Sequence, residues 1–242
     1  MLQVSHVSRS FGSVKAVEDL SFTVRAGEVF ALLGPNGAGK TTTIKMILSM
    51  LKPDAGSILF EGQEISSEEN GYKARIGYVP ESCALYESLN GPEFLEFIGH
   101  LHHLPPADVA RKAGQLLAAV GLAKAERQLI KEYSKGMKQK LLIISALMHD
   151  PDLIILDEPF SGLDANAVSV FKELIREEAR KGKAVVFCSH ILEVVERLVH
   201  RIVIMKDGRR LASGSPDDIL AQTQHKTLDR AFNELTGAVD TD

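Results

Sequence analysis

The sequence predicts an α/β fold built around a phosphate-binding loop, and three patterns support this prediction. Residues 34–42 read Gly-Pro-Asn-Gly-Ala-Gly-Lys-Thr-Thr between a strand-like run and a helix-like run. Leu153–Leu156 and Val185–Cys188 are short apolar runs without alternation, as expected of buried parallel strands. From about Pro92 to His149 the apolar residues instead follow a helical period. Together, these patterns predict a parallel sheet with an inserted helical subdomain.

The part of the chain before the helical segment is expected to be rich in β-structure. Residues 2–33 carry short alternating or apolar runs with a turn at Arg25–Glu28. The helix after the loop should end before Pro53, and strand-like pieces follow at Ser57–Phe60 and Ile76–Val79. The character of the sequence changes after the last of these pieces.

The helical segment has two parts separated by Pro105-Pro106, and the second part runs from Val109 to Val120. One face of the first part carries Phe94, Leu95, Phe97, Ile98 and Leu101. Three histidines, His100, His102 and His103, lie near its end. Because no cysteine or carboxylate sits at ligand spacing from them, we interpret them as solvated helix-end side chains rather than as metal ligands.

Near the end of the chain the pattern predicts a β-hairpin. Arg201–Met205 and Arg209–Ala212 flank Asp207-Gly208, a dipeptide typical of a tight hairpin turn. The chain has no internal repeat and no low-complexity segment.

The composition limits the classes of function and compartment. The 242 residues have a formal net charge of −4, and Lys and Arg are spread along the chain, which argues against nucleic acid as a partner. Cys83 and Cys188 are far apart in sequence, so we expect reduced thiols in a reducing compartment. No run approaches the roughly 18 to 20 apolar residues of a membrane span, and Met1–Ser10 does not resemble a signal peptide. We therefore expect a cytoplasmic chain that reaches a membrane only through another polypeptide.

The phosphate-binding loop predicts a nucleoside triphosphate as ligand. Its glycines allow successive backbone N–H groups to face an anion, and the N-terminus of the following helix adds partial positive charge. Lys40 should reach the β- and γ-phosphates, and the Thr41 hydroxyl should bind Mg²⁺. A glycine-rich tight turn is the alternative, which the complete pattern disfavours. The predicted nucleotide-binding residues of the loop are Gly34, Pro35, Asn36, Gly37, Ala38, Gly39, Lys40, Thr41 and Thr42.

Two acids, Asp157 and Glu158, directly follow the apolar run that ends at Leu156. Because open α/β sheets bind ligands at the carboxyl ends of their strands, these carboxylates are expected beside the phosphates. Asp157 would contact Mg²⁺ through a bound water, and Glu158 would polarise the attacking water. The alternative, that two acids merely end a strand, stays open on this motif alone.

Three further segments complete a resemblance to ATP-binding cassette (ABC) ATPases. Residues 133–139 read Tyr-Ser-Lys-Gly-Met-Lys-Gln, residues 161–164 read Ser-Gly-Leu-Asp, and residues 188–190 read Cys-Ser-His, in the order of that family. The resemblance runs from about Leu2 to Leu220. It implies the α/β fold of that family, a P-loop NTPase core with an antiparallel β-subdomain and an inserted α-helical subdomain.

The resemblance also implies how the chain is divided. Residues 1–220 would form a single ABC ATPase domain, with the helical subdomain at about 85–150, and residues 221–242 would form a short C-terminal tail. Beside Glu81, a membrane partner could contact an apolar groove, although the same spacing would suit the core of the subdomain. The residues of this groove would be Leu85, Tyr86, Leu89 and Phe94.

Several residues receive their roles from the resemblance rather than from spacing. Ser134 and Gly136, at the start of a helix, would contact the γ-phosphate of ATP held by a second ABC ATPase chain, most simply an identical one. His190 would reach the γ-phosphate and hold the attacking water in register with Glu158, whereas a lone histidine after a strand is more often structural. Phe11 would stack on adenine, whereas in isolation it would be interpreted as a core residue. The catalytic residues would be Glu158, His190 and Lys40.

Two departures from the family pattern resemble its exporter branch. Glu81 stands where the family usually has glutamine, and its carboxylate could join Thr41 and Asp157 at Mg²⁺ while adding repulsion toward the γ-phosphate. The Tyr-Ser-Lys-Gly-Met-Lys-Gln segment replaces the usual Leu-Ser-Gly-Gly-Gln. These features, and the segment Thr227–Gly237, are similar to ATPases that drive exporters of drugs, ions, lipids, polysaccharides or antibiotic peptides.

The resemblance therefore implies a chain that binds ATP and Mg²⁺ and hydrolyses ATP to power export through a separate integral membrane permease. Such a chain would lie on the inner face of the cell membrane through the permease, without nucleic acid as a partner. An alternative is a soluble ABC ATPase that acts with a non-membrane partner, for example in cofactor assembly. A small-molecule kinase with a phosphate-binding loop would not explain Ser134, Gly136 and His190 together.

Overall fold

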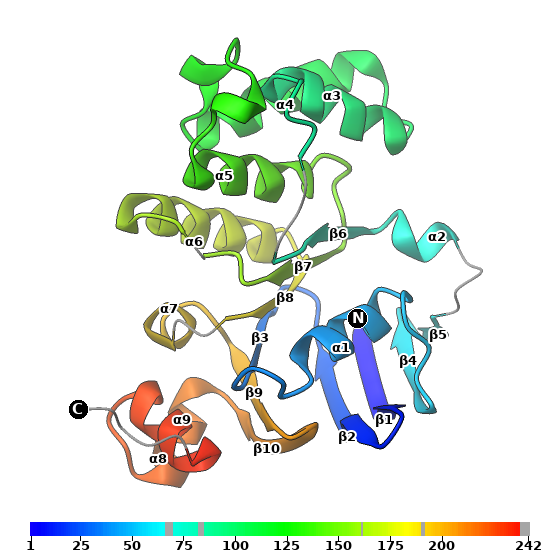
Figure 1. The fold of residues 1–242 in the computed structure, drawn as a ribbon, viewed down its shortest axis with the longest axis vertical. Helices are drawn as coiled ribbons and strands as arrows, with labels where there is room; N and C mark the ends of the chain where they lie inside the picture. Colours follow the sequence, from blue (N-terminus) through cyan, green and yellow to red (C-terminus); the bar gives the residue numbers. More distant parts are fainter. Residues whose placement is uncertain (66–69, 82–84, 161, 190–191, 238–242) are drawn as a thin grey trace.

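The computed structural model describes residues 1–65, 70–81, 85–160, 162–189 and 192–237, and contains two β-sheets with helices around them (Figure 1). The smaller sheet is antiparallel and has the strand order β2-β1-β4-β5. Its strands are β1 (Leu2–Phe11), β2 (Val14–Val24), β4 (Ala55–Phe60) and β5 (Gln63–Glu64). The expected antiparallel β-subdomain is thus confirmed.

The larger sheet has six strands in the order β10-β9-β3-β8-β7-β6. All neighbouring pairs are parallel except β9 and β10, which form the expected hairpin. Its strands are β3 (Val29–Leu33), β6 (Ile76–Val79), β7 (Leu153–Asp157), β8 (Ala184–Cys188), β9 (Arg201–Lys206) and β10 (Arg209–Gly214). The carboxyl ends of β3, β7 and β8 therefore lie at one edge of the sheet.

The central strands of this sheet are buried on both faces, because alternate residues enter two separate cores. On β3, Phe30 and Leu32 pack into the core that contains the antiparallel sheet and α1, whereas Ala31 and Leu33 pack into the core that contains most helices. Every residue of β3, β7 and β8 is buried. This two-sided burial explains the continuous apolar runs in the sequence.

The helical subdomain is inserted between β6 and β7, which are adjacent in the sheet. It contains α3 (Gly91–Leu101), α4 (Pro106–Ala119), two short 3₁₀ turns (Ala123–Ala125 and Ile130–Glu132) and α5 (Lys135–Ser145). Figure 1 shows these helices at the top of the view, whereas the antiparallel sheet lies in the lower half on the right. Between the N-terminus and β9, the structure also describes α1 (Lys40–Ile47), α2 (Asn70–Lys73), α6 (Ala165–Arg180) and α7 (Leu192–Glu196). Of the helices that the structure describes, none combines the length and apolar character needed to cross a membrane.

The C-terminal segment is packed on the core rather than extended. It forms α8 (Pro216–Thr223) and α9 (Leu228–Thr236). Leu228 and Ala231 are fully buried in the helix-side core, and the Leu228 N–H donates to the Glu196 carboxylate on α7 at 3.2 Å. The domain boundary at residue 220 stays a prediction. The segment expected to be a tail nevertheless contributes α9 to the helix-side core.

A stacked pair of histidines joins the helical subdomain to the large sheet. The ring centroids of His102, after α3, and His149, after α5, are 3.6 Å apart with an interplanar angle of 4°. His149 Nε2 donates to the Ile76 carbonyl on β6 at 2.9 Å, while its buried Nδ1 has no partner among the residues described. His102 is therefore an inter-subdomain contact, and not only a solvated helix-end side chain as the sequence suggested.

This pair predicts a pH-dependent contribution to stability. Burial, followed by the charges of His102, Lys112 and Lys183, lowers the pKa of His149 to about 4. An unfolded histidine has a pKa of about 6.5, so between these values the unfolded chain binds more protons and stability falls as the pH falls. We expect His149→Gln, which keeps a donor for Ile76, to lose less unfolding free energy between pH 7 and pH 5 than the unaltered chain. Urea denaturation followed by circular dichroism measures this, and equal losses in both chains would contradict the prediction.

Candidate active site

The phosphate-binding loop joins the end of β3 to the start of α1 and is held between two neighbouring backbones. A Cβ on Gly34 would lie 2.4 Å from the carbonyl oxygen of Met205 on β9. A Cβ on Gly39 would lie 2.3 Å from the carbonyl oxygen of Ala16 on β2, and Gly39 has a φ of 101°. Only glycine fits at these two positions, so the glycine pattern follows from close contact with both sheets.

Lys40, the first residue of α1, extends across the mouth of the loop. Its ammonium donates to the carbonyl oxygens of Gly34 at 2.6 Å and Pro35 at 3.0 Å. The N–H groups at the start of α1 and this ammonium together create a positive region. Such a region suits the phosphate groups of a nucleotide.

A cleft of about 480 Å³ lies over the loop and brings most of the predicted residues together. Its lining residues are Phe11, Val14, Lys15, Ala16, Asn36, Gly37, Ala38, Gly39, Lys40, Thr41, Thr42, Glu81, Asp157, Glu158 and Asp207. The predicted residues Gly34 and Pro35 do not line the cleft, but their carbonyl groups hold Lys40. The loop, the acids and the aromatic residue therefore share one concave site.

Several lining residues were missed by the sequence analysis. Val14 could have been found, because it pairs with Phe11 across the turn between β1 and β2. Lys15 and Ala16 follow it on β2. Asp207 has no local signal: the turn between β9 and β10 reaches the cleft through a non-local hydrogen bond, in which the Glu18 N–H donates to the Gly208 carbonyl at 2.8 Å.

Phe11 lies at the mouth of the cleft and not in a core. Half of its surface is exposed, at 50%, and the guanidinium carbon of Arg9 lies 5.2 Å from its ring centroid. The interpretation of Phe11 as a core residue is therefore wrong. An exposed aromatic ring beside a phosphate-binding loop is suited to stacking on a planar base.

The two acids at the end of β7 differ in environment. Asp157 is buried, and its Oδ2 accepts from the Thr41 hydroxyl at 3.5 Å. Burial, followed by the nearby carboxylates of Glu158 and Glu81, raises the pKa of Asp157, while Lys40 and Thr41 oppose this shift. A cation between these carboxylates and a phosphate would relieve their mutual repulsion.

Glu158 stands at a strained position beside β8. Its φ is 51°, in the left-handed region that is unusual for glutamate, and its N–H donates to the Cys188 carbonyl at 3.1 Å. The hydrogen bond ties the end of β7 to the end of β8, where Asp157 and Cys188 are in register. Non-glycine residues with positive φ often occur at functional sites, and Glu158 lines the cleft.

The donor set in the cleft fits Mg²⁺ only in part. The Thr41 hydroxyl and the Asp157 carboxylate converge, and hard oxygen donors of this kind suit Mg²⁺. Within the described ranges, no group of three or more His, Cys, Asp or Glu side chains could hold a metal ion. Phosphate and water oxygens would therefore have to complete the coordination, which is usual for Mg²⁺ bound with a nucleotide.

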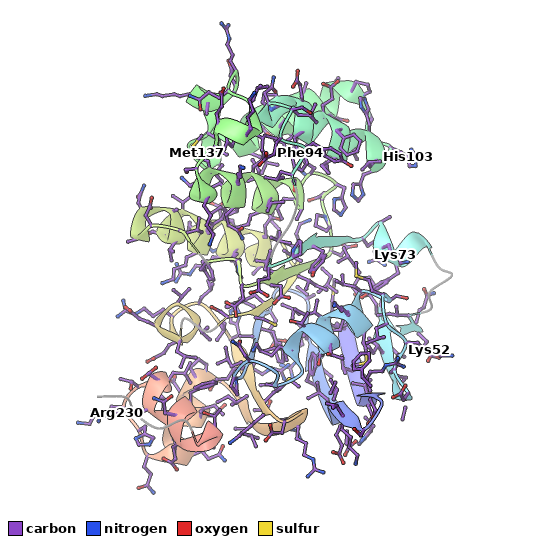
Figure 2. All side chains as sticks on the ribbon, in the orientation of Figure 1. Lys52, Lys73, Phe94, His103, Met137 and Arg230 are labelled. Carbon is purple, nitrogen blue, oxygen red and sulfur yellow. The ribbon has the colours of Figure 1, made fainter. Side chains whose placement is uncertain are left out.

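Ser134 and Gly136 do not lie at this cleft. Ser134 caps α5, and its hydroxyl accepts from the Met137 N–H at 3.2 Å. Figure 2 labels Met137 and Phe94 in the helical subdomain, far from α1. A Cβ on Gly136 would meet no atom closer than 3.6 Å, so this chain alone has room for a side chain there. The segment therefore cannot reach the phosphate-binding loop of its own chain in this structure.

Two predicted features lie partly or wholly outside the described residues. His190 is not among them, and neither is Ser161 of the Ser-Gly-Leu-Asp segment. Cys188 is described and buried, and burial raises the pKa of its thiol. Cys83 is outside the description.

The apolar groove expected for a membrane partner is only partly exposed. Phe94 is buried in the core of the helical subdomain, and Leu85 and Leu89 pack against that core. Tyr86 is 56% exposed and makes an edge contact with Phe97, with ring centroids 5.1 Å apart. Of the four groove residues, Tyr86 therefore offers the largest free surface.

Comparison with known proteins gives consistent matches over most of the chain. A family model described as ABC transporter matches residues 17–161. The linearmycin resistance ATP-binding protein LnrL of Bacillus subtilis is 37% identical over 228 residues, which covers 94% of this chain and 73% of that protein. The Nod factor export ATP-binding protein I of Paraburkholderia xenovorans is 37% identical and covers 91% of this chain and 72% of its own length. The daunorubicin resistance ATP-binding protein DrrA3 of Streptomyces coeruleorubidus is 34% identical, and the match covers 96% of this chain and 74% of that protein.

Solved structures match the fold as a whole. One, described as the ATP-binding subunit of an ABC transporter, is 36% identical with a TM-score of 0.90, and covers 98% of this chain and 99% of its own. A nucleotide-free ATP-binding cassette from an ABC transporter has a TM-score of 0.82 at 24% identity, covering 96% and 98% of the two chains. At that identity the second match supports the fold alone.

The loop geometry predicts that two glycine substitutions differ in cost. Gly37 and Gly39 both have positive φ, so alanine is strained at each by about 1–3 kcal/mol. A Cβ on Gly37 meets nothing within 4 Å, whereas a Cβ on Gly39 meets the Ala16 carbonyl. We expect Gly39→Ala to lower the thermal unfolding midpoint more than Gly37→Ala does, in calorimetry without nucleotide. Equal midpoints would show that β2 does not constrain the loop.

Proposed function

This chain belongs to the ABC transporter family, and we propose that it is the ATPase subunit of an exporter, acting through a separate membrane permease. The observation that carries the proposal is the single cleft that joins Phe11, the phosphate-binding loop and the acids at the end of β7. The names of relatives that concern export or antibiotic resistance support the export direction. They also weigh against the alternative of an ABC ATPase with a non-membrane partner.

The reaction we propose is hydrolysis of ATP to ADP and phosphate. Adenine would stack on Phe11, and Lys40 would bind the β- and γ-phosphates. Thr41, Asp157 and Glu81 would hold Mg²⁺, directly or through water. When bound, Mg²⁺ would neutralise part of the phosphate charge. Glu158 would take the proton of the attacking water, and His190, at the position expected from the sequence, would orient that water.

A second copy of the chain would complete each site. Ser134 and Gly136 are not among the residues that line the cleft of their own chain, and a Cβ on Gly136 would make only ordinary contacts, the nearest at 3.6 Å to the Gly162 carbonyl oxygen. In a head-to-tail homodimer, the start of α5 would face the γ-phosphate bound by the other copy. ATP would then favour the closed dimer, because it would bind that state more tightly than the open one.

The permease would hold the chain at the inner face of the cell membrane. The exposed ring of Tyr86, near Glu81 in sequence, offers an apolar contact for it. The movement of the chain on dimer closure would then be transmitted to the permease beside Glu81.

Replacement of the proposed base tests the reaction. Glu158→Gln keeps the size of the side chain but removes the carboxylate, so hydrolysis should slow by roughly 10²- to 10⁴-fold. The same variant should retain ATP and run as a dimer in size-exclusion chromatography with ATP and Mg²⁺. An unchanged rate of phosphate release would show that Glu158 is not the base, and a monomer at high concentration would contradict the homodimer.

The identity of the partner can be tested separately. Tagged Glu158→Gln, purified in mild detergent from its native cells with ATP and Mg²⁺, is expected to carry a multi-span membrane protein that mass spectrometry identifies. The same purification without nucleotide provides the control for nonspecific binding. Recovery of soluble partners alone would favour an ABC ATPase that acts away from the membrane.

A further inference from the structure

Phe11 lies outside both hydrophobic cores, so its ring is not held by the packing that orders the buried aromatic side chains. It is the last residue of β1, at the turn to β2. The contact that the structure shows for its ring is with Arg9, two residues earlier on the same strand, whose guanidinium carbon lies 5.2 Å from the ring centroid. Arg9 is therefore placed to influence the orientation of the ring.

Arg9 is itself held by the segment that follows α1. Its Nη1 donates to the Asp54 carboxylate at 2.5 Å and to the Lys52 carbonyl at 3.2 Å. The other carboxylate oxygen of Asp54 accepts from the Ser10 N–H at 2.8 Å, and the Asp54 N–H donates to the Ser8 carbonyl at 2.8 Å. Hydrogen bonds between charged groups are among the strong ones. The guanidinium is therefore restricted in position relative to the end of β1.

The ring contact offsets an unfavourable feature of the Arg9 side chain. Its Nε is buried and has no hydrogen-bond partner in the described part of the chain. Burial of a polar group without a partner is unfavourable. Because the face of an aromatic ring carries partial negative charge, it attracts a guanidinium. This attraction favours the guanidinium over the Phe11 ring.

The guanidinium leaves one side of the Phe11 ring free. Phe11 lines the cleft over the phosphate-binding loop, whereas Arg9 is not among the lining residues. The guanidinium therefore contacts the ring from outside the cleft, and a flat base that enters the cleft would meet the other side. Stacking of two aromatic groups depends on the relative orientation of their planes. A ring that is already oriented can therefore bind a base more favourably than a freely rotating one.

We propose that Arg9 is a positioning residue for nucleotide binding, which acts through Phe11 by holding its ring with the free side toward the base. The proposal rests on the stacking of adenine on Phe11 in the function proposed above. Arg9 does not touch the nucleotide, and the loop binds the phosphate groups independently of it. Loss of the guanidinium should therefore weaken the binding of ligands that carry a base and spare those that consist of phosphate alone.

Two ligands separate these effects. ADP carries a base and is not hydrolysed, whereas pyrophosphate carries the same two phosphates without one. Arg9→Met removes the guanidinium and should weaken ADP binding by roughly 3- to 10-fold, as expected for loss of a partly buried cation–π contact, with pyrophosphate binding unchanged. Isothermal titration calorimetry with Mg²⁺ measures both affinities. In steady-state ATPase assays, KM for ATP should rise while kcat stays within about twofold.

Arg75→Met provides a matched control. The Arg75 guanidinium also lies over a ring, 4.7 Å from the Phe60 centroid, and also pairs with an aspartate, Asp152, at 2.6 Å. Because neither Arg75 nor Phe60 lines the cleft, Arg75→Met should change neither affinity. Arg9→Lys keeps a cation for the Asp54 carboxylate but lacks the planar group, and should weaken ADP binding by less than Arg9→Met.

A variant of the ring distinguishes this proposal from the one on which it rests. Phe11→Leu should weaken ADP binding by roughly 5- to 100-fold, the contribution of stacking on one base, and Arg9→Met should add nothing in that background. If Phe11→Leu weakens ADP binding but Arg9→Met does not, or weakens pyrophosphate equally, the role of Arg9 is overturned and the proposed function stands. If Phe11→Leu leaves ADP binding unchanged, the proposed stacking fails, and the role of Arg9 fails with it.

Discussion

Burial of the central strands on both faces is the constraint on which the rest of this structure depends. A strand such as β3 places alternate residues into two cores, so it needs the antiparallel sheet on one face and helices on the other. Each fully buried aliphatic side chain contributes about 1.5–3 kcal/mol relative to an exposed one. Polar side chains are therefore disfavoured in the middle of these strands. The ends of the strands are left as the place for the loop, Asp157 and Glu158.

The same packing holds the phosphate-binding loop in place before any ligand is bound. Gly34 lies against the backbone of β9, and Gly39 lies against the backbone of β2, so both sheets contact the loop. Because a backbone cannot move aside as a flexible side chain can, the orientation of the N–H groups in the loop is largely set by the fold. When the site is already ordered, binding of a ligand loses less conformational entropy, so the binding free energy is more favourable.

The chain also carries a surface that its own fold does not explain. Ser134 and Gly136 are at the start of α5, away from the cleft; the Ser134 hydroxyl caps this helix, and a Cβ on Gly136 would make only ordinary contacts with Gly162 and Leu163. The capping role explains Ser134 within one chain, whereas no contact within the described part of the chain requires glycine at position 136. Their chemistry instead suits an anion presented by another molecule, which is why the proposed site is divided between two copies.

The sequence by itself determined the elements whose signals are local. The loop, the buried strands β7 and β8, the hairpin of β9 and β10 and the position of the acids follow from residue spacing over short segments. Helix ends were less accurate: the sequence placed the end of the helix after the loop only before Pro53, whereas α1 ends at Ile47. The sequence placed the two acids beside the phosphate-binding loop because parallel strands end at one edge, and the hydrogen bond from Thr41 to Asp157 is the contact that the structure adds.

Tertiary structure alone decided the features that depend on distant segments. Three of these features bring together residues far apart in sequence: Asp207 approaches the cleft, His102 stacks on His149, and α9 is buried against the core. The fourth is the exposure of Phe11, which depends on no other segment covering its ring. An aromatic residue or a histidine has the same local pattern whether a neighbour covers it or not. Only the arrangement of the two cores and the inserted helices determines which side chains remain open to a ligand and which are buried.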